Sequence, residues 1–571
     1  PTPQDRDESQ EADEGEGDTD AEVGVDPNTI LSMKKDLVPP GKIRPQTPED
    51  AEALEMRQLV SKGVFKPVTW KPGIRCLDCK MITKPKDDGY KGRFCGRGFR
   101  QDASVYRETT SPTCAIEVVM MVLAICAAEG RKAMILDIVS AYLEAFMDEE
   151  IHVLLSDRQT KAVLAIEPAW KRYVHKGQLT VLVVRALYGL KQSAKLWYDL
   201  LSESLKAIGF VQNPKEVCCM NMMIEGSQAT ICLHVDDLLI THATEAGCRK
   251  VISLVKEQFA HMRVKEGPDF TYLGMQVSRH GDDVQVGMPV YEESIIKEWR
   301  EVAGWKTDKK SPTPGQTDLM EVDEESDRLS DGDSKIFHTG VAKLLYLAKR
   351  TRPDILTATS VMAGRVREPN VKDLMKLNRI YAYLNGSRNK CIRFKGGLPL
   401  DIKVFGDAAF MVHVIRMLSR TGVAAFINGG PVATISQAQK LTTKSTCGAE
   451  FITLTEAAAW ALFIREFLLY QGDTVPCITL YCDNQSVIDL LKANHCGIKG
   501  TKHLKVRYFF VRQHIESGEI VVKWCPTEDM VADIMTKQLT GQLFKDMRDK
   551  IVHDMYVDPK CTPVIRGCVE Y

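Results

Sequence analysis

The pattern of apolar and polar positions predicts a mixture of helices and strands in the first half of the chain. An amphipathic helix is expected from about Thr47, because acidic residues fill its first turn and suit the positive end of the helix dipole. The apolar stretch 118–128 is typical of a buried helix and is too short to span a bilayer. Residues 229–235 and 238–243 are rich in β-branched and apolar side chains, which predicts two strands joined by a turn.

The pattern changes twice in the second half. Pro, Gly and acidic residues crowd residues 311–334, which predicts an acidic linker. Helical periodicity follows over 340–386. From residue 401 onward strands alternate with long helices, as in an α/β layer, so we expect a domain boundary near residue 400.

Length and charge narrow the class of protein. The chain has 571 residues, 44% of them hydrophobic, which is enough for three or four folded units. Residues 1–26 and 317–333 carry charges of −10 and −7, so a net charge of −1 leaves +16 on the rest. Such an excess of Lys and Arg suits a polyanionic partner such as nucleic acid, although a folded domain can carry it without one. Residues 1–28 have too few apolar side chains to offset the entropy lost on ordering, and are predicted to be disordered.

Cysteine usage and the N-terminus suggest an intracellular fragment. The 17 cysteines follow no disulfide framework and often lie in apolar runs, which predicts reduced thiols. Cys76 and Cys79 form a C-x-x-C pair, but no second pair follows at zinc-ribbon spacing, so two plain thiols are favoured over a metal site. We expect no signal peptide and no transmembrane segment. The sequence begins with Pro1 and not Met, which indicates a fragment or a processed product.

Three aspartates stand where strand patterns end. Asp137 closes the run "KAMILD", and Asp236 and Asp237 lie between two apolar runs in "ICLHVDDLLITH". An Asp-Asp turn is ordinarily a solvated hairpin. Here the flanks are unusually apolar, and two neighbouring like charges repel each other unless a cation such as Mg²⁺ relieves the repulsion. The residues by themselves leave both interpretations open.

Five motifs between Tyr90 and Ile240 resemble, in order, the reverse transcriptase of copia-type LTR retrotransposons. They are "YKGRFCGRGFRQ", "YRETTSPT", "LDIVSAYL", "ALYGLKQSAKLWYDLL" and "HVDDLLI". The resemblance implies that Asp137, Asp236 and Asp237 are the metal-binding triad of a polymerase palm, with Asp237 the least essential ligand. Two Mg²⁺ ions there would serve the primer hydroxyl and the leaving pyrophosphate.

The same resemblance implies roles for four substrate-binding residues. Tyr142 matches the aromatic gate whose ring excludes a ribose 2′-hydroxyl, the only group that separates the two kinds of nucleotide. Lys91 and Arg93 match the basic pair near the incoming triphosphate, where Arg can grip phosphate in bidentate fashion. An exposed basic strand is the alternative for this pair. Gln192, in the turn "GLKQS", is a further candidate for contact with the nucleotide.

Four more acids follow after residue 400, each where the local pattern changes. Asp407 follows the predicted strand "IKVFG", Glu450 lies in a long helix, Asp483 ends the strand "CITLYC", and Asp533 lies in the predicted helix "EDMVADIMTK". A lone Glu on a helix is nearly always part of a solvated face. The order of strand-Asp, helix-Glu, strand-Asp and helix-Asp resembles RNase H, and "LYCDNQS" and "ADIMTKQL" resemble the copia-type version.

That second resemblance implies a nuclease that acts with the polymerase. The four carboxylates would hold two metal ions that activate water against an RNA phosphodiester. The basic, aromatic stretch "HLKVRYFFVRQH" would hold the hybrid backbone through His503, Lys505, Arg507 and Arg512, although some of its aromatic residues must be core.

Three features depart from the family pattern. His234 stands where Tyr is usual; the imidazole could replace the phenol's hydrogen bond, bind a metal or titrate near neutral pH. The segment "GDAAFMVHVIRMLSRTG" lacks the usual Asp-x-Trp after the first RNase H acid, and "WCPTEDM" lacks a His that often aids product release. These changes leave the acids in place but suggest a decaying element.

We therefore expect an α+β chain in which a right-hand polymerase, with fingers, a ferredoxin-like palm and a thumb or connection, precedes an α/β RNase H-like domain. The predicted divisions are an acidic leader (1–28), fingers and palm (29–275), thumb and connection (276–400) containing the acidic linker (311–334), an RNase H-like domain (401–540) and a C-terminal tail (541–571).

The expected function is RNA-directed DNA synthesis with RNase H cleavage, in the downstream part of a Pol polyprotein. The resemblance implies two Mg²⁺ ions per active site, with Mn²⁺ as a substitute, and implies as partners an RNA template, a DNA primer, an RNA·DNA hybrid and deoxynucleoside triphosphates. It implies that no membrane is a partner, and that the protein is located in a cytoplasmic virus-like particle with access to the nucleus. The oligomeric state is left open. The alternative is a catalytically lapsed relic that only binds nucleic acid.

Overall fold

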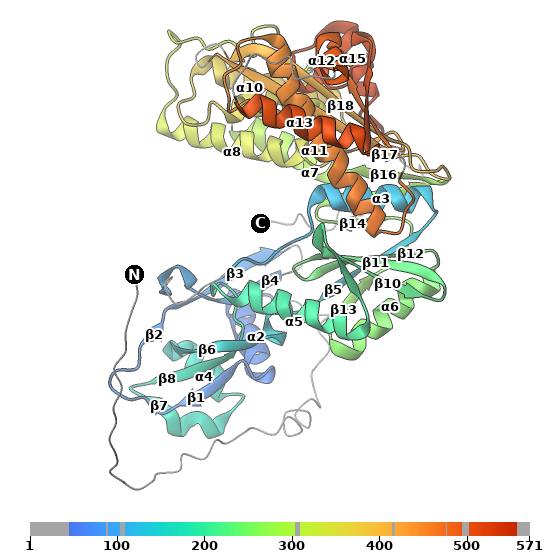
Figure 1. The fold of residues 1–571 in the computed structure, drawn as a ribbon. Coiled ribbons are helices and arrows are strands. Elements are labelled where there is room, and N and C mark those ends of the chain that lie inside the picture. Colours follow the sequence, from blue (N-terminus) through green and yellow to red (C-terminus); the bar gives the residue numbers. More distant parts are fainter. Residues whose placement is uncertain are drawn as a thin grey trace, which may run out of the picture.

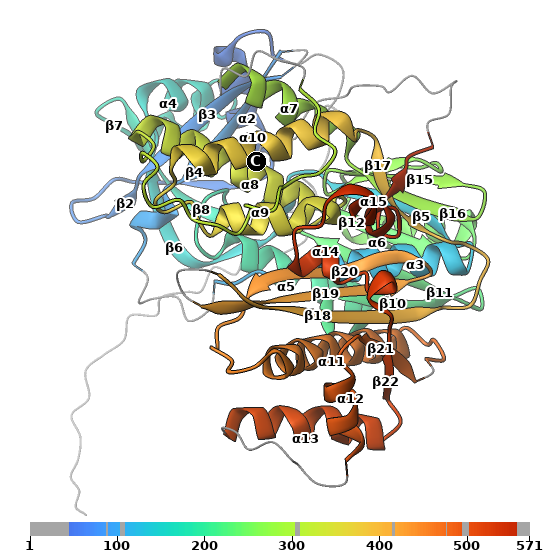
Figure 2. The same ribbon diagram turned by 90° about the horizontal axis from the view of Figure 1, so that it is seen from above.

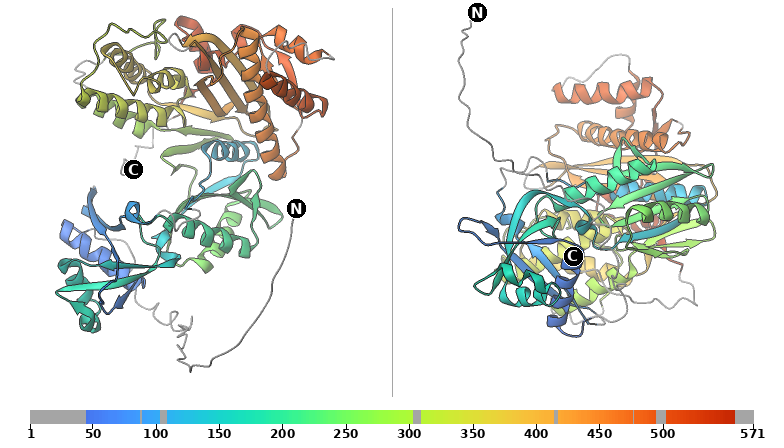
Figure 3. Two further views of the ribbon diagram at one scale, coloured as in Figure 1. Left: turned by 60° about the vertical axis from the view of Figure 1, so that its left-hand side comes forward. Right: turned by 90° about the horizontal axis from the view of Figure 1, so that it is seen from below.

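The chain folds into two lobes that meet at one apolar helix. The computed structural model describes residues 45–556, with gaps at 87–88, 103–108, 303–308, 414–416, 476 and 494–501. One lobe holds the elements up to about residue 265 and the other those from helix α8 onward, as Figure 1 and the left view of Figure 3 show. Helix α3 (Ile116–Ala128) lies where the lobes meet and is almost wholly buried, as its apolar sequence predicts. The predicted disordered leader lies outside the described residues.

The N-terminal part packs a sheet and a hairpin against helix α2 (Pro48–Ser61). The helix begins next to Thr47, as predicted, and Thr47 caps it: its Oγ1 accepts a hydrogen bond from the backbone N–H of Asp50 at 3.1 Å. The smaller helices of the N-terminal part are η1 (Gly98–Arg100), η3 (Ala141–Glu144), α4 (Asp157–Leu164) and η4 (Pro168–Tyr173). The N-terminal sheet has the order β1 (Phe65–Val68), β8 (Gln178–Arg185), β6 (Phe146–Leu154) and β2 (Cys76–Leu77), with β7 (Val174–His175) on β8; β3 (Cys79–Lys86) and β4 (Gly89–Gly96) form the hairpin.

The next sheet, called the central sheet below, carries the first three acids. Its spatial order is β13 (Met262–Lys265), β5 (Lys132–Ile138), β12 (Asp237–His242), β11 (Ser227–His234), β10 (Glu216–Ile224) and β9 (Val211–Asn213). Helix α5 (Ser193–Ile208) follows β5, and helix α6 (Glu245–Gln258) joins β12 to β13. Strands β5, β11, β12 and β13 with these two helices make a βαββαβ unit whose strand order is 4-1-3-2 and whose neighbouring strands are all antiparallel.

A third sheet and a group of helices connect the two lobes. The sheet has the order β14 (Phe270–Tyr272), β15 (Met275–His280), β16 (Asp283–Gly287), β17 (Lys390–Phe394) and β23 (His553–Asp554). The helices are α7 (Pro289–Val302), α8 (Asp331–Ala348), η5 (Pro353–Ile355), α9 (Leu356–Ala363) and α10 (Val371–Gly386). The fully buried guanidinium of Arg352 binds Glu292 of α7 and Asp354 of η5, each at 2.8 Å, which fixes these helices to one another.

Helix α8 begins inside the predicted acidic linker. Ser330 caps it by accepting a hydrogen bond from Asp333 N, and Asp331 and Asp333 lie in the first turn, where acidic side chains stabilise a helix. The end of the predicted linker therefore belongs to a helix. The predicted C-terminal tail also contains regular structure, because residues 541–554 hold helix α15 (Gly541–Asp549) and strand β23, which pairs with β17.

The C-terminal sheet carries the remaining acids. Its order is β20 (Gly430–Ala438), β19 (Leu418–Ile427), β18 (Ile402–His413), β21 (Ile478–Cys482) and β22 (Ile520–Trp524). The first three strands are antiparallel, and β18, β21 and β22 run parallel. The remaining helices are α11 (Thr446–Tyr470), α12 (Gln485–Lys492), α13 (Lys502–Glu516), η6 (Thr527–Asp529) and α14 (Asp533–Thr536). Figure 2 shows α11 against one face of this sheet, α13 beyond it, and α14 on the other side.

Helix α11 is long and apolar enough to pass for a membrane span by length and composition. Most of its apolar stretch, 61%, is nevertheless buried inside the structure. Its buried side chains pack on β18, β19 and β21, which is the position of a core helix in a folded α/β layer.

The C-terminal end of α11 ties the C-terminal sheet to the edge of the central sheet. Gln471, 3% exposed, accepts a hydrogen bond at its Oε1 from Gln228 Nε2 of β11 at 3.1 Å, and its Nε2 donates to the Cys219 Sγ of β10 at 3.3 Å. Asn213 of β9 donates to the Phe467 carbonyl at 3.2 Å. These polar contacts reach into the core of the central sheet, so the two sheets are held in one relative position.

Asp473, just after α11, makes this contact sensitive to pH. Its Oδ2 is buried without a hydrogen-bond partner among the described residues, and burial, with repulsion from Glu129, raises the pKa of its carboxyl to about 6. Since the folded pKa lies above the unfolded value, the wild type loses stability as the pH rises from about 4 to 6. We predict that Asp473→Asn raises the free energy of unfolding by about 1 kcal/mol at pH 8, after allowing for partial exposure, and has no effect near pH 4.

Urea unfolding of both proteins across this pH range would test the prediction. Asp489→Asn, at an exposed position of α12, controls for the loss of one surface charge. An effect of Asp473→Asn that is the same at pH 4 and pH 8 would contradict the assignment to this carboxyl.

Candidate active sites

Strands β5 and β12 place the first acid set (Asp137, Asp236, Asp237) at one end of the central sheet. Asp237 is the direct register partner of Asp137, and the preceding pairs continue down the two strands. Leu238, Leu239 and Ile240 of β12 are 0% exposed, so the core holds both strands in place. Cross-strand partners project to the same face, which brings the two carboxylates together at the surface. The geometry thus gives no reason to rank Asp237 as the least essential of the three.

The turn that carries Asp236 is held in an unfavourable backbone conformation. Val235 has φ = +58°, a region that a β-branched residue rarely adopts. Two hydrogen bonds fix this turn: the indole Nε1 of Trp197 donates to the Val235 carbonyl at 2.7 Å, and Ile138 N donates to the Asp236 carbonyl at 2.9 Å. Trp197 is 1% exposed, so it is a core residue that also supports the turn. A freely solvated hairpin would need neither contact.

The carboxyl pKa values of Asp236 and Asp237 in the first acid set are raised, as expected for buried acids that lie near one another. Burial, followed by repulsion from Asp236 and then Asp137, raises the pKa of Asp237 to about 6. Burial also raises the pKa of Asp236, with Asp137 adding to the shift. A neighbouring cation comes from β13, where Arg263 Nη1 lies 4.0 Å from Asp137 Oδ2. The sequence analysis missed Arg263, although the alternating basic strand "MRVK" was a signal.

Strand β4 brings the predicted basic pair to the same end of the central sheet. Glu55 of α2, 9% exposed, accepts a hydrogen bond from Phe94 N at 3.1 Å and so fixes β4 on the helix. The Arg93 guanidinium lies over the Tyr188 ring at 4.9 Å. Arg93 shifts the pKa of Lys91 downward, after burial, while Asp137 shifts it upward, so Lys91 lies within electrostatic reach of both. Lys91 and Arg93 are therefore placed beside the first acid set.

Tyr142 lies next to the first acid set and packs on a second tyrosine. Its ring centroid is 5.3 Å from that of Tyr188, and burial, followed by the Asp236 carboxylate, raises the pKa of its phenol. Tyr188, in the motif "ALYGLKQS", was missed in the sequence analysis; burial raises the pKa of its phenol to about 12. The two rings form an aromatic wall, with the Arg93 guanidinium over the Tyr188 ring.

Gln192 caps helix α5 at a buried position. It is 2% exposed, and its Oε1 accepts a hydrogen bond from Gln101 Nε2 at 3.1 Å. Its own Nε2 has no hydrogen-bond partner among the described residues. An unpartnered buried donor is costly, so this amide lacks one favourable hydrogen bond.

His234 is the register partner of Asp237 across the hairpin. Burial lowers the pKa of its imidazole, and Arg350 lowers it further, so the ring is neutral at pH 7. Its buried Nδ1 has no hydrogen-bond partner among the described residues. A neutral ring with a free nitrogen matches the expectation of a hydrogen-bonding replacement for Tyr better than that of a charged group.

The second acid set (Asp407, Glu450, Asp483, Asp533) meets at the C-terminal sheet. Its members come from β18, α11, the end of β21 and the first residue of α14. The carboxylate oxygens of Asp407, Asp483 and Asp533 lie within 4.8 Å of one another, and Glu450 and Asp483 form a similar group with Cys482. Such a set of oxygen atoms suits a hard divalent cation. The first acid set is looser, since its three carboxylates do not meet this distance.

The predicted position of Asp407 at the end of a strand is wrong. Strand β18 continues to His413, and Asp407 lies in its middle, paired with Gly422 of β19. The small side chains of Ala408 and Ala409 allow the strand to continue under α14. A Cβ on Gly422 would lie 2.5 Å from Thr536 Cγ2 and 2.9 Å from the Ala532 carbonyl, so only glycine permits α14 to come this close.

The second acid set is buried, which disfavours the ionised form of its carboxyl groups. Asp407 and Asp533 are 1% and 3% exposed. Burial, followed by the Asp407 carboxylate, raises the pKa of Glu450, of Asp483 and of Asp533. Glu450 Oε2 accepts a hydrogen bond from Ala408 N at 3.2 Å, which holds α11 to β18. The Trp524 indole donates to the Asp483 carbonyl at 3.2 Å.

One cation that the sequence analysis missed lies among these acids. Lys537 Nζ is 2.7 Å from Asp533 Oδ1 and 3.4 Å from Asp407 Oδ1. Thr536 Oγ1 also donates to Asp407 Oδ2. Both residues belong to the quoted motif "ADIMTKQL", so the signal was present but only its aspartate was considered.

The predicted nucleic-acid-binding residues of α13 do not gather at the second acid set. Arg507 pairs with Glu456 of α11 at 3.6 Å, and Arg512 binds Glu516 at 2.6 Å and the Tyr508 hydroxyl at 2.7 Å. Lys505 is exposed, and the side chain of His503 lies outside the described residues. Figure 2 shows α13 on the far side of α11 from the sheet. Arg507 and Arg512 thus have structural partners within the chain.

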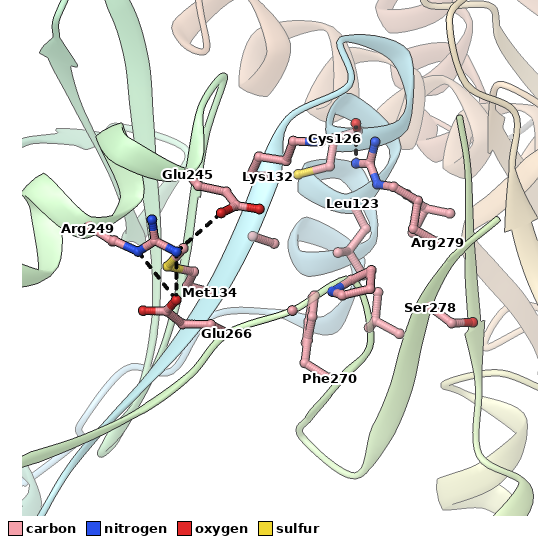
Figure 4. A pocket seen from close by; sticks show the side chains of 15 residues that line it. Leu123, Cys126, Lys132, Met134, Glu245, Arg249, Glu266, Phe270, Ser278 and Arg279 are labelled. Carbon is pink, nitrogen blue, oxygen red and sulfur yellow. Dashed lines mark hydrogen bonds and ion pairs between the residues drawn. The ribbon is translucent and has the colours of Figure 1, made fainter. Parts of the chain in front are cut away.

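A cavity of about 490 Å³ lies between α3, β5, the start of α6 and strands β14 to β16. Figure 4 shows Arg249 on one wall, bound to Glu245 at 3.2 Å and to Glu266 at 2.9 Å, and Arg279 on the other, bound to the Cys126 carbonyl at 3.1 Å. None of the seven candidate acids lines it. The cavity is therefore separate from both acid sets.

The central sheet and the first acid set belong to a region that matches a known family. Residues 67–309, which include Lys91, Arg93 and all three acids, match the family described as "Reverse transcriptase (RNA-dependent DNA polymerase)". This part of the chain therefore resembles a reverse transcriptase domain.

Similar proteins extend the relationship along most of the chain. It is 27% identical over 508 residues to "Retrovirus-related Pol polyprotein from transposon TNT 1-94" of Nicotiana tabacum, covering 86% of this chain and 36% of that one. It is 26% identical to the transposon RE1 Pol polyprotein of Arabidopsis thaliana, over 84% of this chain and 32% of that one, and 25% identical to the Ty1-MR1 Gag-Pol polyprotein of Saccharomyces cerevisiae, over 84% and 27%. Over most of its length, the chain is therefore similar to Pol polyproteins of plant and yeast transposons.

The chain spans about a third of the length of these relatives. Among solved structures, it is similar to the foamy viral protease-reverse transcriptase in complex with double-stranded DNA, with a TM-score of 0.47 and 13% identity over 87% of this chain and 73% of that one.

The hydrogen bond from Trp197 to the turn gives a testable prediction. We expect Trp197→Phe to lower the free energy of unfolding by about 1–3 kcal/mol, because the buried Val235 carbonyl loses its donor while the aromatic core is kept. Denaturant unfolding would measure the change. Trp460→Phe, at a half-buried position of α11, is the matched control. Equal effects of the two substitutions would show that the indole nitrogen does not support the turn.

Proposed function

We propose that this chain copies RNA into DNA at the first acid set and cleaves the RNA strand of the resulting hybrid at the second. The observation that carries the polymerase assignment is the pairing of Asp137 with Asp237 beside a strained turn that presents Asp236. The membership of residues 67–309 in the reverse transcriptase family supports it. The substrates are an RNA template, a DNA primer and deoxynucleoside triphosphates, and a hybrid is the product.

The residues around the first acid set have roles that follow from their positions. Divalent ions held by the three carboxylates, Mg²⁺ being the proposed ion and Mn²⁺ its substitute, would supply the charge that activates a primer hydroxyl and stabilises the leaving pyrophosphate. Lys91 and Arg93 attract the triphosphate from β4, and the stack on Tyr188 keeps the Arg93 guanidinium oriented. The free amide N–H of Gln192 donates to the nucleotide or its template partner.

Tyr142 is the proposed gate against ribonucleotides. Its ring is close enough to Asp236 to feel its charge and is supported from behind by Tyr188. A sugar bound over the acids would place its 2′ position against this aromatic wall. Because the ring and not the hydroxyl provides the obstacle, Phe should replace Tyr at this position.

The second acid set supports the RNase H assignment. Its order along the chain is the strand-Asp, helix-Glu, strand-Asp, helix-Asp series, and three of the four acids bring oxygens within 4.8 Å of one another. These oxygens suit two Mg²⁺ ions that would activate water against a phosphodiester. The Gln471 contacts hold the C-terminal sheet against the central sheet, so the two acid sets keep one relative position.

Separate inactivation of the two sites tests the proposal. We expect Asp236→Asn to reduce primer extension on RNA by about 100-fold or more, since a metal ligand is lost, and to spare RNA cleavage. Asp483→Asn should have the opposite effect. Asp282→Asn, in an exposed turn, is the control for both assays.

The outcomes separate the proposal from its alternative. Extension that is unchanged in Asp236→Asn would remove the polymerase site from this sheet. If the wild type binds a hybrid but neither extends nor cleaves it with Mg²⁺ or Mn²⁺, the chain is a relic that only binds nucleic acid.

The gate gives a second prediction at the polymerase site. Tyr142→Val should lower the preference for deoxynucleotides over ribonucleotides by about 10- to 100-fold, because the 2′-hydroxyl no longer meets a ring. Tyr142→Phe should keep the wild-type preference. The ratio of kcat/KM for dNTP and rNTP in single-nucleotide extension measures it, and a loss of preference in Tyr142→Phe as well would assign the selectivity to the phenol hydroxyl instead.

A further inference from the structure

Lys537 has an unusual position for a lysine in a site made of carboxylates. It follows α14, and its ammonium lies 2.7 Å from Asp533 Oδ1 and 3.4 Å from Asp407 Oδ1. These two carboxylates are 5% and 1% exposed as side chains, whereas the lysine side chain is 40% exposed. The ammonium therefore enters the second acid set from the solvent side and ends on its two most buried members.

The second acid set needs a cation in order to remain charged. Like charges repel one another strongly at short range where water is excluded, and here several carboxylates share one buried space. Among the described residues, Lys537 is the basic side chain that forms ion pairs with Asp407 and Asp533. It also offsets the rise in the pKa of Glu450 and of Asp483, although burial dominates there.

The oxygens bound by Lys537 belong to the carboxylates that could hold a metal ion. Asp407 and Asp533, with Asp483, form the group whose oxygens lie within 4.8 Å of one another. An ammonium group and a divalent ion cannot both occupy the space between Asp407 and Asp533 at these distances. Lysine is suited to give way, since its flexible four-carbon stem can move without a change in the main chain.

We infer that Lys537 is a built-in counter-ion of the second acid set, which holds the site together before a divalent ion binds and competes with that ion for Asp407 and Asp533. This inference rests on the proposed RNase H function of the site. It assigns Lys537 as a positioning residue that sets how much metal the site requires. Its removal should therefore strengthen metal binding while weakening the metal-free fold.

Direct metal binding is the first test, because it needs no substrate. The full chain with Asp236→Asn and Asp237→Asn provides a background in which the first acid set no longer contributes. Free Mn²⁺ measured by electron paramagnetic resonance would give the Kd of the remaining site. We expect K537Q in this background to bind Mn²⁺ about tenfold more tightly, because no ammonium has to be displaced. K537R, which keeps the charge, and K523Q, at an exposed position of β22, should stay close to the wild type.

Thermal unfolding with and without metal is the second test. In EDTA, K537Q should melt about 3–5 °C below the wild type and below K523Q, because buried carboxylates repel one another without a counter-ion. Saturating Mg²⁺ should remove most of this difference. If K537Q does not fold in EDTA, recovery of its circular dichroism on addition of Mn²⁺ is the corresponding supporting result.

The results distinguish failure of this inference from failure of the proposed function. If Asp407→Asn abolishes the Mn²⁺ site while K537Q leaves its Kd and the metal-free melting temperature unchanged, Lys537 is not a counter-ion but the metal site stands. If neither the wild type nor K537Q binds Mn²⁺ at this site, both the inference and the metal-dependent RNase H proposal fall. A melting temperature of K537R as low as that of K537Q would assign the effect to packing and overturn the inference.

Discussion

Repulsion between carboxylates that the core forces together is the constraint on which both sites depend. Strands β5 and β12 cannot separate Asp137 from Asp237, because the apolar residues beneath them are buried. In the same way, Gly422 lets α14 approach β18 until Asp533 meets Asp407. In each case packing energy, proportional to the apolar area removed from water, holds together charges that would otherwise move apart. The fold therefore creates a demand for cations at two defined places.

The two acid sets meet this demand in different ways. The first set faces Arg263 at 4.0 Å, while Lys91 and Arg93 stand on another element. This arrangement leaves room for a nucleotide with its own charges. The second set is more enclosed and contains Lys537 within hydrogen-bond distance. The cation supplied by the chain therefore lies closer to the acids in the second set than in the first.

The sequence predicted the acids but not the residues that control them. Motif order located all seven acids, and apolar patterns located α2, α3 and the β11–β12 hairpin, because these signals are local. Trp197 acts on a turn 38 residues away and Lys537 on an acid 130 residues away, so no pattern within one element could connect them. Asp407 was misplaced because two alanines after it hide the continuation of β18. Arg507 and Arg512 lie in a basic, aromatic stretch of the kind that binds nucleic acid. In the structure, however, Arg507 forms an ion pair and Arg512 a hydrogen bond with residues of the same chain.

Helix α11 mechanically connects the second acid set to the central sheet. Glu450 lies near its beginning, and Gln471 just beyond its end enters the central sheet through Gln228 and Cys219. These residues are 21 positions apart, which is about 30 Å along a helix. A small tilt at the Gln471 end is therefore carried along a rigid rod to a member of the second acid set. Because the Gln471 contacts are buried and polar, they tolerate few alternative geometries, and the position of Glu450 is set partly by the sheet that carries the first acid set.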